Sequence, residues 1–281
     1  MTKFFYRTLN DLNTLIKDNQ ARLQSYNFDL IVGLPRRGMI PATLIGLFLN
    51  KPVVSFNELV ADLASEKIGY RLREESAKSP KSYQNILLID DSTNEGSAFQ
   101  AAKEKLDEDT WNKITTMSIY STKKGTNSVD LALEVLESPK IFEWNIMHKR
   151  VVLAVSSMRF EGIIASNAIT GQWELITAPS YPIKVIVSEL REKNRAEVEE
   201  FLETNHIQYE HLIMEVVSSK QLKEIAQEYD VKLHYETDPT IARDMLDTTS
   251  VYNPISNQLV NTIEQEVIDF DTTDNSELSK M

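Results

Sequence analysis

Short apolar runs alternate with longer amphipathic stretches along most of the chain. The four consecutive apolar residues at 86–89 are typical of a strand that is buried on both faces of a parallel sheet. Leu12, Leu15 and Ile16, by contrast, follow the spacing of one helical face. The alternation of the two patterns predicts an α/β fold with doubly wound, mainly parallel sheets.

The pattern predicts two successive series of elements. In the first series we expect helices at 9–24, 41–49 and 98–106, and strands at 29–33, 53–55, 86–89 and 114–120. In the second series we expect strands at 151–155, 183–187, 211–217 and 232–235, and helices at 195–204, 220–229 and 240–246. We therefore predict one domain over 1–140, a second over 150–260, and a flexible acidic tail over 263–281.

Composition and charge narrow the classes of function. The chain has no run near the roughly 18 apolar residues of a membrane span, and its start becomes polar too soon for a signal peptide. The absence of cysteine excludes disulfides, thiol catalysis and cysteine-bound metal centres. A formal net charge of −12 argues against general nucleic-acid binding. We expect a cytoplasmic protein without a membrane anchor, and self-association stays open.

Two turns in the first half carry candidate chemistry. The loop 33–39 after a predicted strand contains Arg36, Arg37 and Gly38, and a helix follows it. Guanidinium groups and backbone N–H donors at a helix start suit pyrophosphate. The second turn follows the strand at 86–89 and begins with the paired acids Asp90 and Asp91. Such acids also occur at receiver-type phosphorylation sites and metal sites, but in open α/β sheets this edge is where ligands bind.

The two turns, in this order, resemble motifs of the type I phosphoribosyltransferases, and the resemblance covers about 1–140. It implies that Asp90 and Asp91 are the catalytic residues, which hold the ribose hydroxyls, one of them through Mg²⁺. It also implies that phosphoribosyl pyrophosphate, or a related phosphoribosyl ligand, is bound. The substrate-binding residues that it implies are Arg36, Arg37, Gly38, Ser92, Thr93, Asn94, Gly96 and Ser97, with Arg71 and Arg73 in a flexible hood over the leaving group.

The phosphate turn departs from the family pattern. The family usually has Thr-Gly-x-Thr, whereas this chain has Glu95-Gly96-Ser97-Ala98, which replaces two hydroxyls and adds a carboxylate. Two functions therefore stay open. One is transfer of phosphoribose to an unidentified acceptor with release of pyrophosphate. The other is a catalytically inactive binding, sensor or assembly protein that recognises a phosphoribosyl metabolite or a protein partner.

The second half resembles the haloacid dehalogenase-like phosphohydrolases over about 150–260. The family motif Asp-x-Asp-Gly, whose first Asp is the nucleophile, matches a stretch in which Arg159 and Glu161 stand in place of the two acids. Further matches are Ser188, Lys220 or Lys223, and the acidic stretch 236–239. Because an arginine cannot attack phosphorus, we expect a degenerate domain without phosphatase activity, with a structural, dimerising or ligand-sensing role.

Overall fold

The computed structural model describes residues 3–63, 79–167 and 171–262. Their contacts divide into two units: the first unit is Phe4–Trp144, and the second consists of Lys3 and the described chain from Asn145 onward. The hood residues Arg71 and Arg73 and the predicted tail lie outside the described residues. The predicted domain ranges 1–140 and 150–260 remain predictions.

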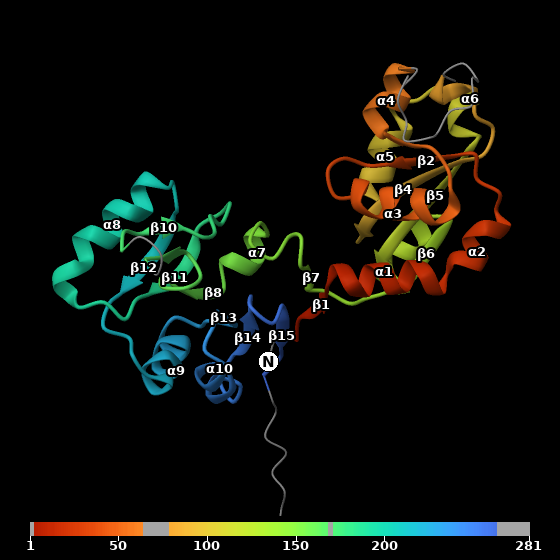
Figure 1. Cartoon of the computed structure of the whole chain (residues 1–281). Helices are drawn as coiled ribbons and strands as arrows, with labels where there is room; N and C mark the ends of the chain where they lie inside the picture. The colour runs from red at the N-terminus through yellow and green to blue at the C-terminus, as the bar shows by residue number, and fades with distance from the viewer. Residues whose placement is uncertain (1–2, 64–78, 168–170, 263–281) are drawn as a thin grey trace, which may run out of the picture. The chain divides into compact units, whose positions relative to one another are not determined.

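The first unit is built around a parallel sheet (Figure 1). Its described strands run in the order β3-β2-β4-β5-β6, and every neighbouring pair is parallel. A separate parallel pair joins β1 to β7. In chain order the elements are β1 (Phe5–Arg7), α1 (Leu9–Asp18), α2 (Gln20–Ser25), β2 (Leu30–Gly33), α3 (Met39–Leu49), β3 (Val53–Ser55), α4 (Phe56–Ala61), the 3₁₀ turn η1 (Pro80–Ser82), β4 (Ile86–Thr93), α5 (Ser97–Lys103), α6 (Glu108–Trp111), β5 (Ile114–Ser121), η2 (Gly125–Ser128), β6 (Leu131–Val135) and β7 (Lys140–Phe142).

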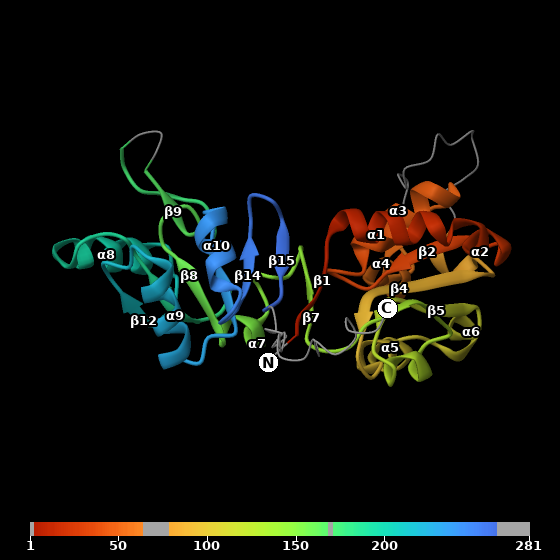
Figure 2. The same ribbon diagram turned by 90° about the horizontal axis from the view of Figure 1, so that it is seen from below.

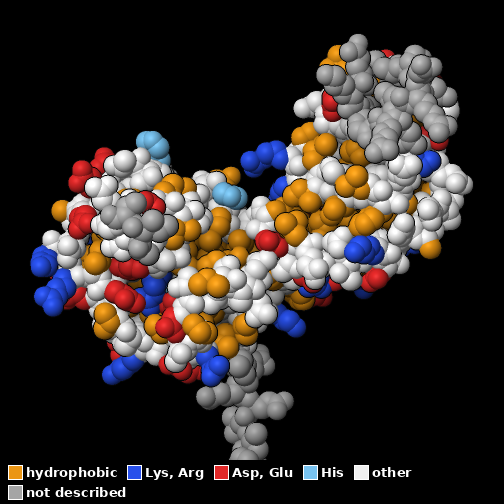
Figure 3. Space-filling view, in the orientation of Figure 1, with side chains coloured by type: hydrophobic (Ala, Val, Ile, Leu, Met, Phe, Trp, Pro, Cys, Tyr) orange, Lys and Arg blue, Asp and Glu red, His pale blue; other side chains and the backbone are white. Residues whose placement is uncertain are grey.

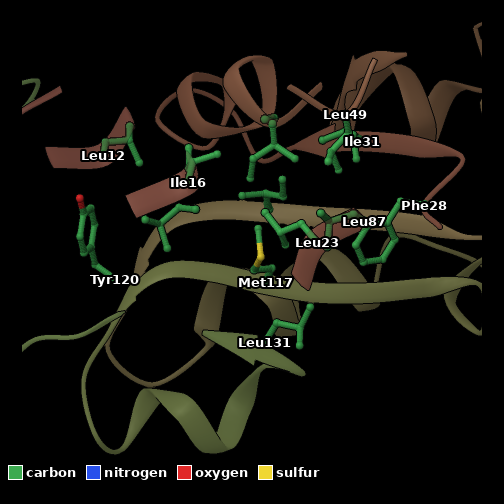
Figure 4. Packing of buried hydrophobic residues seen from close by; sticks show 14 of the residues in the cluster. Leu12, Ile16, Leu23, Phe28, Ile31, Leu49, Leu87, Met117, Tyr120 and Leu131 are labelled. Carbon is green, nitrogen blue, oxygen red and sulfur yellow. The ribbon is translucent and has the colours of Figure 1, made fainter. Parts of the chain in front are cut away.

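Helices cover both faces of this sheet. Leu87 and Ile89 of β4 pack in a cluster with side chains of α1, α2 and α3, and Figure 4 shows this packing. Ile86 and Leu88 pack in a second cluster with side chains of α4 and α5. Because successive strand residues point to opposite faces, an unbroken apolar run is buried on both sides. The predicted doubly wound arrangement is confirmed for this unit.

The second unit also contains a mainly parallel sheet, with its described strands in the order β12-β11-β8-β13-β14-β15. Only the edge pair β14–β15, seen in Figure 2, is antiparallel among these neighbours. The elements are α7 (Arg150–Leu153), β8 (Ser156–Arg159), β9 (Ala165–Ser166), β10 (Glu174–Leu175), β11 (Ile183–Val187), η3 (Glu192–Asn194), α8 (Arg195–Thr204), β12 (Tyr209–Ile213), α9 (Ser219–Glu228), β13 (Leu233–Tyr235), α10 (Pro239–Met245), β14 (Ser250–Asn253) and β15 (Gln258–Val260). The α/β class is therefore confirmed here too, whereas the haloacid dehalogenase-like assignment stays a prediction.

The strand predicted at 151–155 is wrong. This segment forms the short helix α7, in which Val152 is buried and Val151 is 66% exposed. The strand is β8, the next four residues, and it is polar in three of its four positions. Its serines are buried because Ser156 donates to the Val152 carbonyl and Ser157 bonds with His234. A short apolar run does not distinguish helix from strand, and a strand of hydrogen-bonded polar residues has no apolar pattern.

Other boundaries also differ from the prediction. The helix expected at 9–24 is divided at Asn19, whose side chain donates to the Leu15 carbonyl. The strand expected at 211–217 ends at Ile213, and the backbone turns left-handed at Glu215. Strand β4 continues to Thr93, because the residues that we expected in a turn pair with β5.

The surface adds two observations. None of the helices among the described residues is long and apolar enough to cross a membrane. Figure 3 shows hydrophobic side chains gathered on the visible face of the first unit, and Leu47 of α3 is 73% exposed. Such exposure is compatible with self-association, which remains a prediction.

Candidate functional site

Pairing of β2 with β4 brings the two predicted turns together. Gly33 lies opposite Ile89, and the Leu34 backbone N–H donates to the Ile89 carbonyl over 2.8 Å. A Cβ atom at Gly38 would come within 2.5 Å of that same carbonyl oxygen. Glycine at this position therefore lets the β2–α3 loop lie against the end of β4.

The two acids of β4 have different surroundings. Asp91 is 1% exposed, and its Oδ2 accepts the indole N–H of Trp144 over 2.7 Å and lies 3.9 Å from the Arg37 Nε. The Oδ1 of Asp90 accepts the backbone N–H of Asp91 over 2.9 Å. Burial, and then the charge of Asp91, raise the pKa of Asp90 to about 7. The end of β4 thus holds a carboxylate pair that is costly to ionise fully without a further cation.

Asp90 and Arg37 line one cleft of about 420 Å³. Lys105 adds a second cation to this cleft, and the small side chain of Ala98 faces it as well. The remaining lining residues are Leu34, Pro35, Phe56, Asn57, Ala101 and Ala102. An acid and two cations in one concave site suit a ligand that carries both hydroxyls and anionic groups.

The turn after β4 is closely packed. The Thr93 hydroxyl accepts the Gly96 backbone N–H over 2.9 Å, and Gly96 has φ +84°. A Cβ at Gly96 would lie 2.4 Å from that of Ser128, so glycine is needed for both conformation and space. Lys140, a buried residue of β7, donates to the Thr93 carbonyl over 2.8 Å.

Glu95 is paired within this turn. Its Oε1 accepts a hydrogen bond from the Lys124 ammonium group over 2.6 Å, and both side chains are mostly exposed. The hydrogen bond from Lys124 and its charge hold the pKa of Glu95 below the usual range. The carboxylate that departs from the family pattern is therefore partly neutralised by a neighbouring cation and screened by water.

The other predicted substrate residues are placed as follows. Arg36 is exposed on the β2–α3 loop, beside Arg37. Ser92 is half-buried on β4, Asn94 is exposed in the turn, and Ser97 is the first residue of α5. The structure thus brings the acids, the arginine loop and the turn to one edge of the sheet.

Sequence reasoning missed Trp144 and Lys140. Both follow the predicted sheet, and their hydrogen bonds to Thr93 and Asp91 place them against β4. Lys140 is the first residue of β7, and the burial of that strand is visible only in the structure, so the sequence offered no signal for Lys140. A single tryptophan offers none.

The donor set at the end of β4 suits a magnesium ion. Mg²⁺ prefers oxygen ligands and is held in such sites by one or two carboxylates together with substrate phosphates. Among the described residues, no group of three or more His, Cys, Asp or Glu side chains could hold a metal ion by itself. The residues therefore fit Mg²⁺ that arrives with a phosphorylated ligand.

The second unit gathers most of its motif residues in one buried cluster. The Arg159 Nε donates to Glu236 over 2.8 Å, and its Nη1 donates to Glu189 over 2.7 Å. Glu161 accepts hydrogen bonds from the Ser188 hydroxyl and from the Glu189 backbone N–H. Lys220 and Lys223 do not join this cluster, because they pair with acids of their own, Glu224 and Asp247.

Glu236 is ionised in this cluster. Burial alone would raise its pKa, but the nearby His234, whose Nε2 lies 3.6 Å from Oε2, the hydrogen bond from the Asp238 backbone and the charge of Arg159 lower it to about 2. Arg159 therefore supplies the buried cation that balances this acid. On the phosphohydrolase alignment predicted from the sequence, this cation stands in place of the nucleophile.

Comparisons with known proteins give structural similarity alone. No family model matches the chain, and no curated protein matches it. A purine phosphoribosyltransferase from Pyrococcus horikoshii is 17% identical with a TM-score of 0.37, covering 51% of this chain and 94% of that one. A xanthine-guanine-hypoxanthine phosphoribosyltransferase from Helicobacter pylori is 15% identical with a TM-score of 0.39, covering 51% and 95%. A hypothetical protein from Neisseria gonorrhoeae with bound ppGpp is 15% identical with a TM-score of 0.37, covering 52% and 90%.

Proposed function

We propose that the first unit binds phosphoribosyl pyrophosphate with Mg²⁺ and transfers phosphoribose to a small acceptor, with release of pyrophosphate. The observation that carries the proposal is the position of Asp90 and Asp91, at the carboxyl end of β4 and against the β2–α3 loop that bears Arg37. Carboxylates can hold ribose hydroxyls, and guanidinium groups can hold pyrophosphate. The cytoplasmic location also remains a proposal.

The residue types match the charges that the reaction creates. The bond from the ribose C1 to pyrophosphate breaks, the electron pair leaves with pyrophosphate, and C1 bonds to the acceptor. Positive charge then grows on the ribose ring, beside Asp90 and Asp91, and negative charge grows on the leaving group, beside Arg36 and Arg37. Fixed charges that stabilise both changes lower the barrier without a nucleophilic side chain.

Asp90 and Asp91 are the residues that would hold Mg²⁺. When bound, the ion neutralises pyrophosphate charge and orients the ligand. The raised pKa of Asp90 supports this assignment, because a cation would relieve the repulsion between the two acids. Arg37, 53% exposed in its side chain, has the freedom to turn toward a ligand.

A second candidate function is ligand binding without turnover. The observation in its favour is the phosphate turn, where the Gly96 backbone N–H already donates to Thr93. With Glu95 and Ala98 in place of hydroxyl residues, this turn has fewer donors to offer a phosphate. Such a site would bind the 5-phosphate weakly, which is compatible with a sensor of a phosphoribosyl metabolite.

Release of pyrophosphate distinguishes the two candidates. The full-length chain is incubated with phosphoribosyl pyrophosphate, Mg²⁺ and a panel of purine and pyrimidine bases. A transferase releases pyrophosphate with at least one base, and Asp91→Asn lowers the rate by about 100-fold, as for loss of one fixed transition-state contact. Asp109→Asn, on the exposed face of α6, is the matched control and leaves the rate unchanged. Binding without release by any base identifies the sensor, and equal rates in Asp91→Asn contradict the site.

A further inference from the structure

Trp144 makes a directed contact with one acid of the candidate site. Its indole N–H donates to the Asp91 Oδ2 over 2.7 Å. That oxygen lies 3.9 Å from the Arg37 Nε, which is beyond hydrogen-bond distance. The indole therefore fixes the direction of a carboxylate that is 1% exposed.

The ring of Trp144 is itself held in place. It stacks on Phe142 with the centroids 4.8 Å apart and the planes 7° from parallel. Tyr120 of β5 lies on the same aromatic cluster, 5.0 Å from Phe142 and 6.5 Å from Trp144 between ring centroids. Phe142 belongs to β7, whose pairing with β1 fixes the backbone just before Trp144. Because the ring packs in this aromatic cluster, the indole N–H of Trp144 has little freedom to change its direction.

We propose that Trp144 is a positioning residue that holds the Asp91 carboxylate in the direction in which it meets the ribose hydroxyls. This inference rests on the proposed function of the same site. A neutral N–H orients the acid without cancelling its charge, whereas an arginine in bidentate contact would neutralise it. The Asp91 carboxylate is thus oriented by an uncharged donor rather than by a cation.

The test removes the N–H and keeps the ring stack. In Trp144→Phe, the affinity for phosphoribosyl pyrophosphate with Mg²⁺ falls by about tenfold or more, the size expected for a hydrogen bond to a charged group. The affinity for inorganic pyrophosphate, measured without Mg²⁺, stays unchanged, because that ligand uses the arginine loop. In the Asp91→Asn background, Trp144→Phe has little further effect, since the two residues act as one unit.

The second unit offers a matched control. Trp173 makes the same kind of bond, with its indole N–H 2.8 Å from a carboxylate oxygen of Glu197. Trp173→Phe therefore removes an equivalent hydrogen bond and leaves the affinity for phosphoribosyl pyrophosphate unchanged. An equal loss in both variants overturns the assignment of Trp144.

Fluorescence provides a readout that keeps Trp144 intact. The chain has three tryptophans, so the double variant Trp111→Phe/Trp173→Phe leaves Trp144 as the single emitter. Its emission changes on addition of phosphoribosyl pyrophosphate with Mg²⁺ and on Asp91→Asn. Absence of any binding by the wild-type chain contradicts the proposed function, whereas full affinity in Trp144→Phe contradicts the positioning role alone.

Discussion

Asp90 and Asp91 set two adjacent carboxylates at the end of one strand, and the pKa of Asp90 reaches about 7 through burial and then the charge of Asp91. An acid whose pKa is raised on folding binds its proton more tightly in the folded state. Its contribution to stability is complete below the ordinary value of 3.8, and it is lost as the pH rises through 7.

We therefore expect a pH-dependent difference between the wild-type chain and Asp90→Asn. Without Mg²⁺, the wild-type free energy of unfolding falls relative to that of the variant between pH 4 and 7, by up to an amount on the order of 4 kcal/mol. Urea unfolding in EDTA at a series of pH values measures this difference. Parallel pH profiles for the two proteins would show that Asp90 ionises normally.

Glu95 is the residue that most weakens the resemblance to an active transferase, because it adds a carboxylate to the phosphate turn. Its pairing with Lys124 reduces the repulsion between that carboxylate and a phosphate. We expect Glu95→Thr to change the affinity for phosphoribosyl pyrophosphate with Mg²⁺ by less than about threefold, because a paired, exposed charge is screened by water and salt. Calorimetry at 0.15 M salt measures this affinity. Lys124→Met is the counterpart variant, which leaves Glu95 unpaired and weakens binding. A large gain in Glu95→Thr would mean that the acid blocks the site.

At the scale of elements, the buried pair Arg159–Glu236 links the last residue of β8 to the residue that follows β13. Removing one partner leaves a buried charge without its counterion. We expect Arg159→Met to lower the free energy of unfolding by about 3–5 kcal/mol. Adding Glu236→Gln to that variant recovers part of the loss, because no buried charge is left unpaired and Glu189, the other partner of Arg159, is 50% exposed. Chemical unfolding of the three proteins measures the effect, and an additive loss in the double variant would exclude this coupling.

The same cluster predicts no phosphate hydrolysis by the second unit. In the alignment predicted from the sequence, Arg159 stands in place of the nucleophile, and in the structure it donates to two acids. We expect no turnover of para-nitrophenyl phosphate by the full chain with Mg²⁺. Turnover that persists in Ser188→Ala and in Glu161→Ala would contradict the alignment of these residues with the phosphohydrolase motifs.

The elements that the sequence predicted well are those that burial of apolar side chains alone determines. Strand β4 was recognised because four apolar residues are buried by helices on both faces. Strand β8 was missed because its serines and Arg159 are satisfied by partners from distant segments, which leaves no apolar pattern. Trp144 was missed for a related reason: its bond to Asp91 spans 53 positions, and no local sequence pattern indicates a contact over that separation.

At the scale of the whole molecule, two parallel-sheet units each gather charged residues at the carboxyl ends of their strands. In the first unit, Asp90, Arg37 and Lys105 line a cleft that is open to a ligand. In the second unit, Arg159 and its acids are paired with one another and the arginine is buried. The same kind of sheet edge therefore carries a candidate binding site in one unit and a closed ionic cluster in the other.

The central claim is that the end of β4 binds phosphoribosyl pyrophosphate with Mg²⁺. Titration calorimetry of the full-length chain tests it most directly, with the wild type and with Asp90→Asn/Asp91→Asn. We expect saturable heat for the wild type and its loss in the double variant, while inorganic pyrophosphate, titrated without Mg²⁺, still binds to the variant through the arginine loop. Absence of heat in the wild type, or equal binding of phosphoribosyl pyrophosphate by both proteins, would contradict the claim.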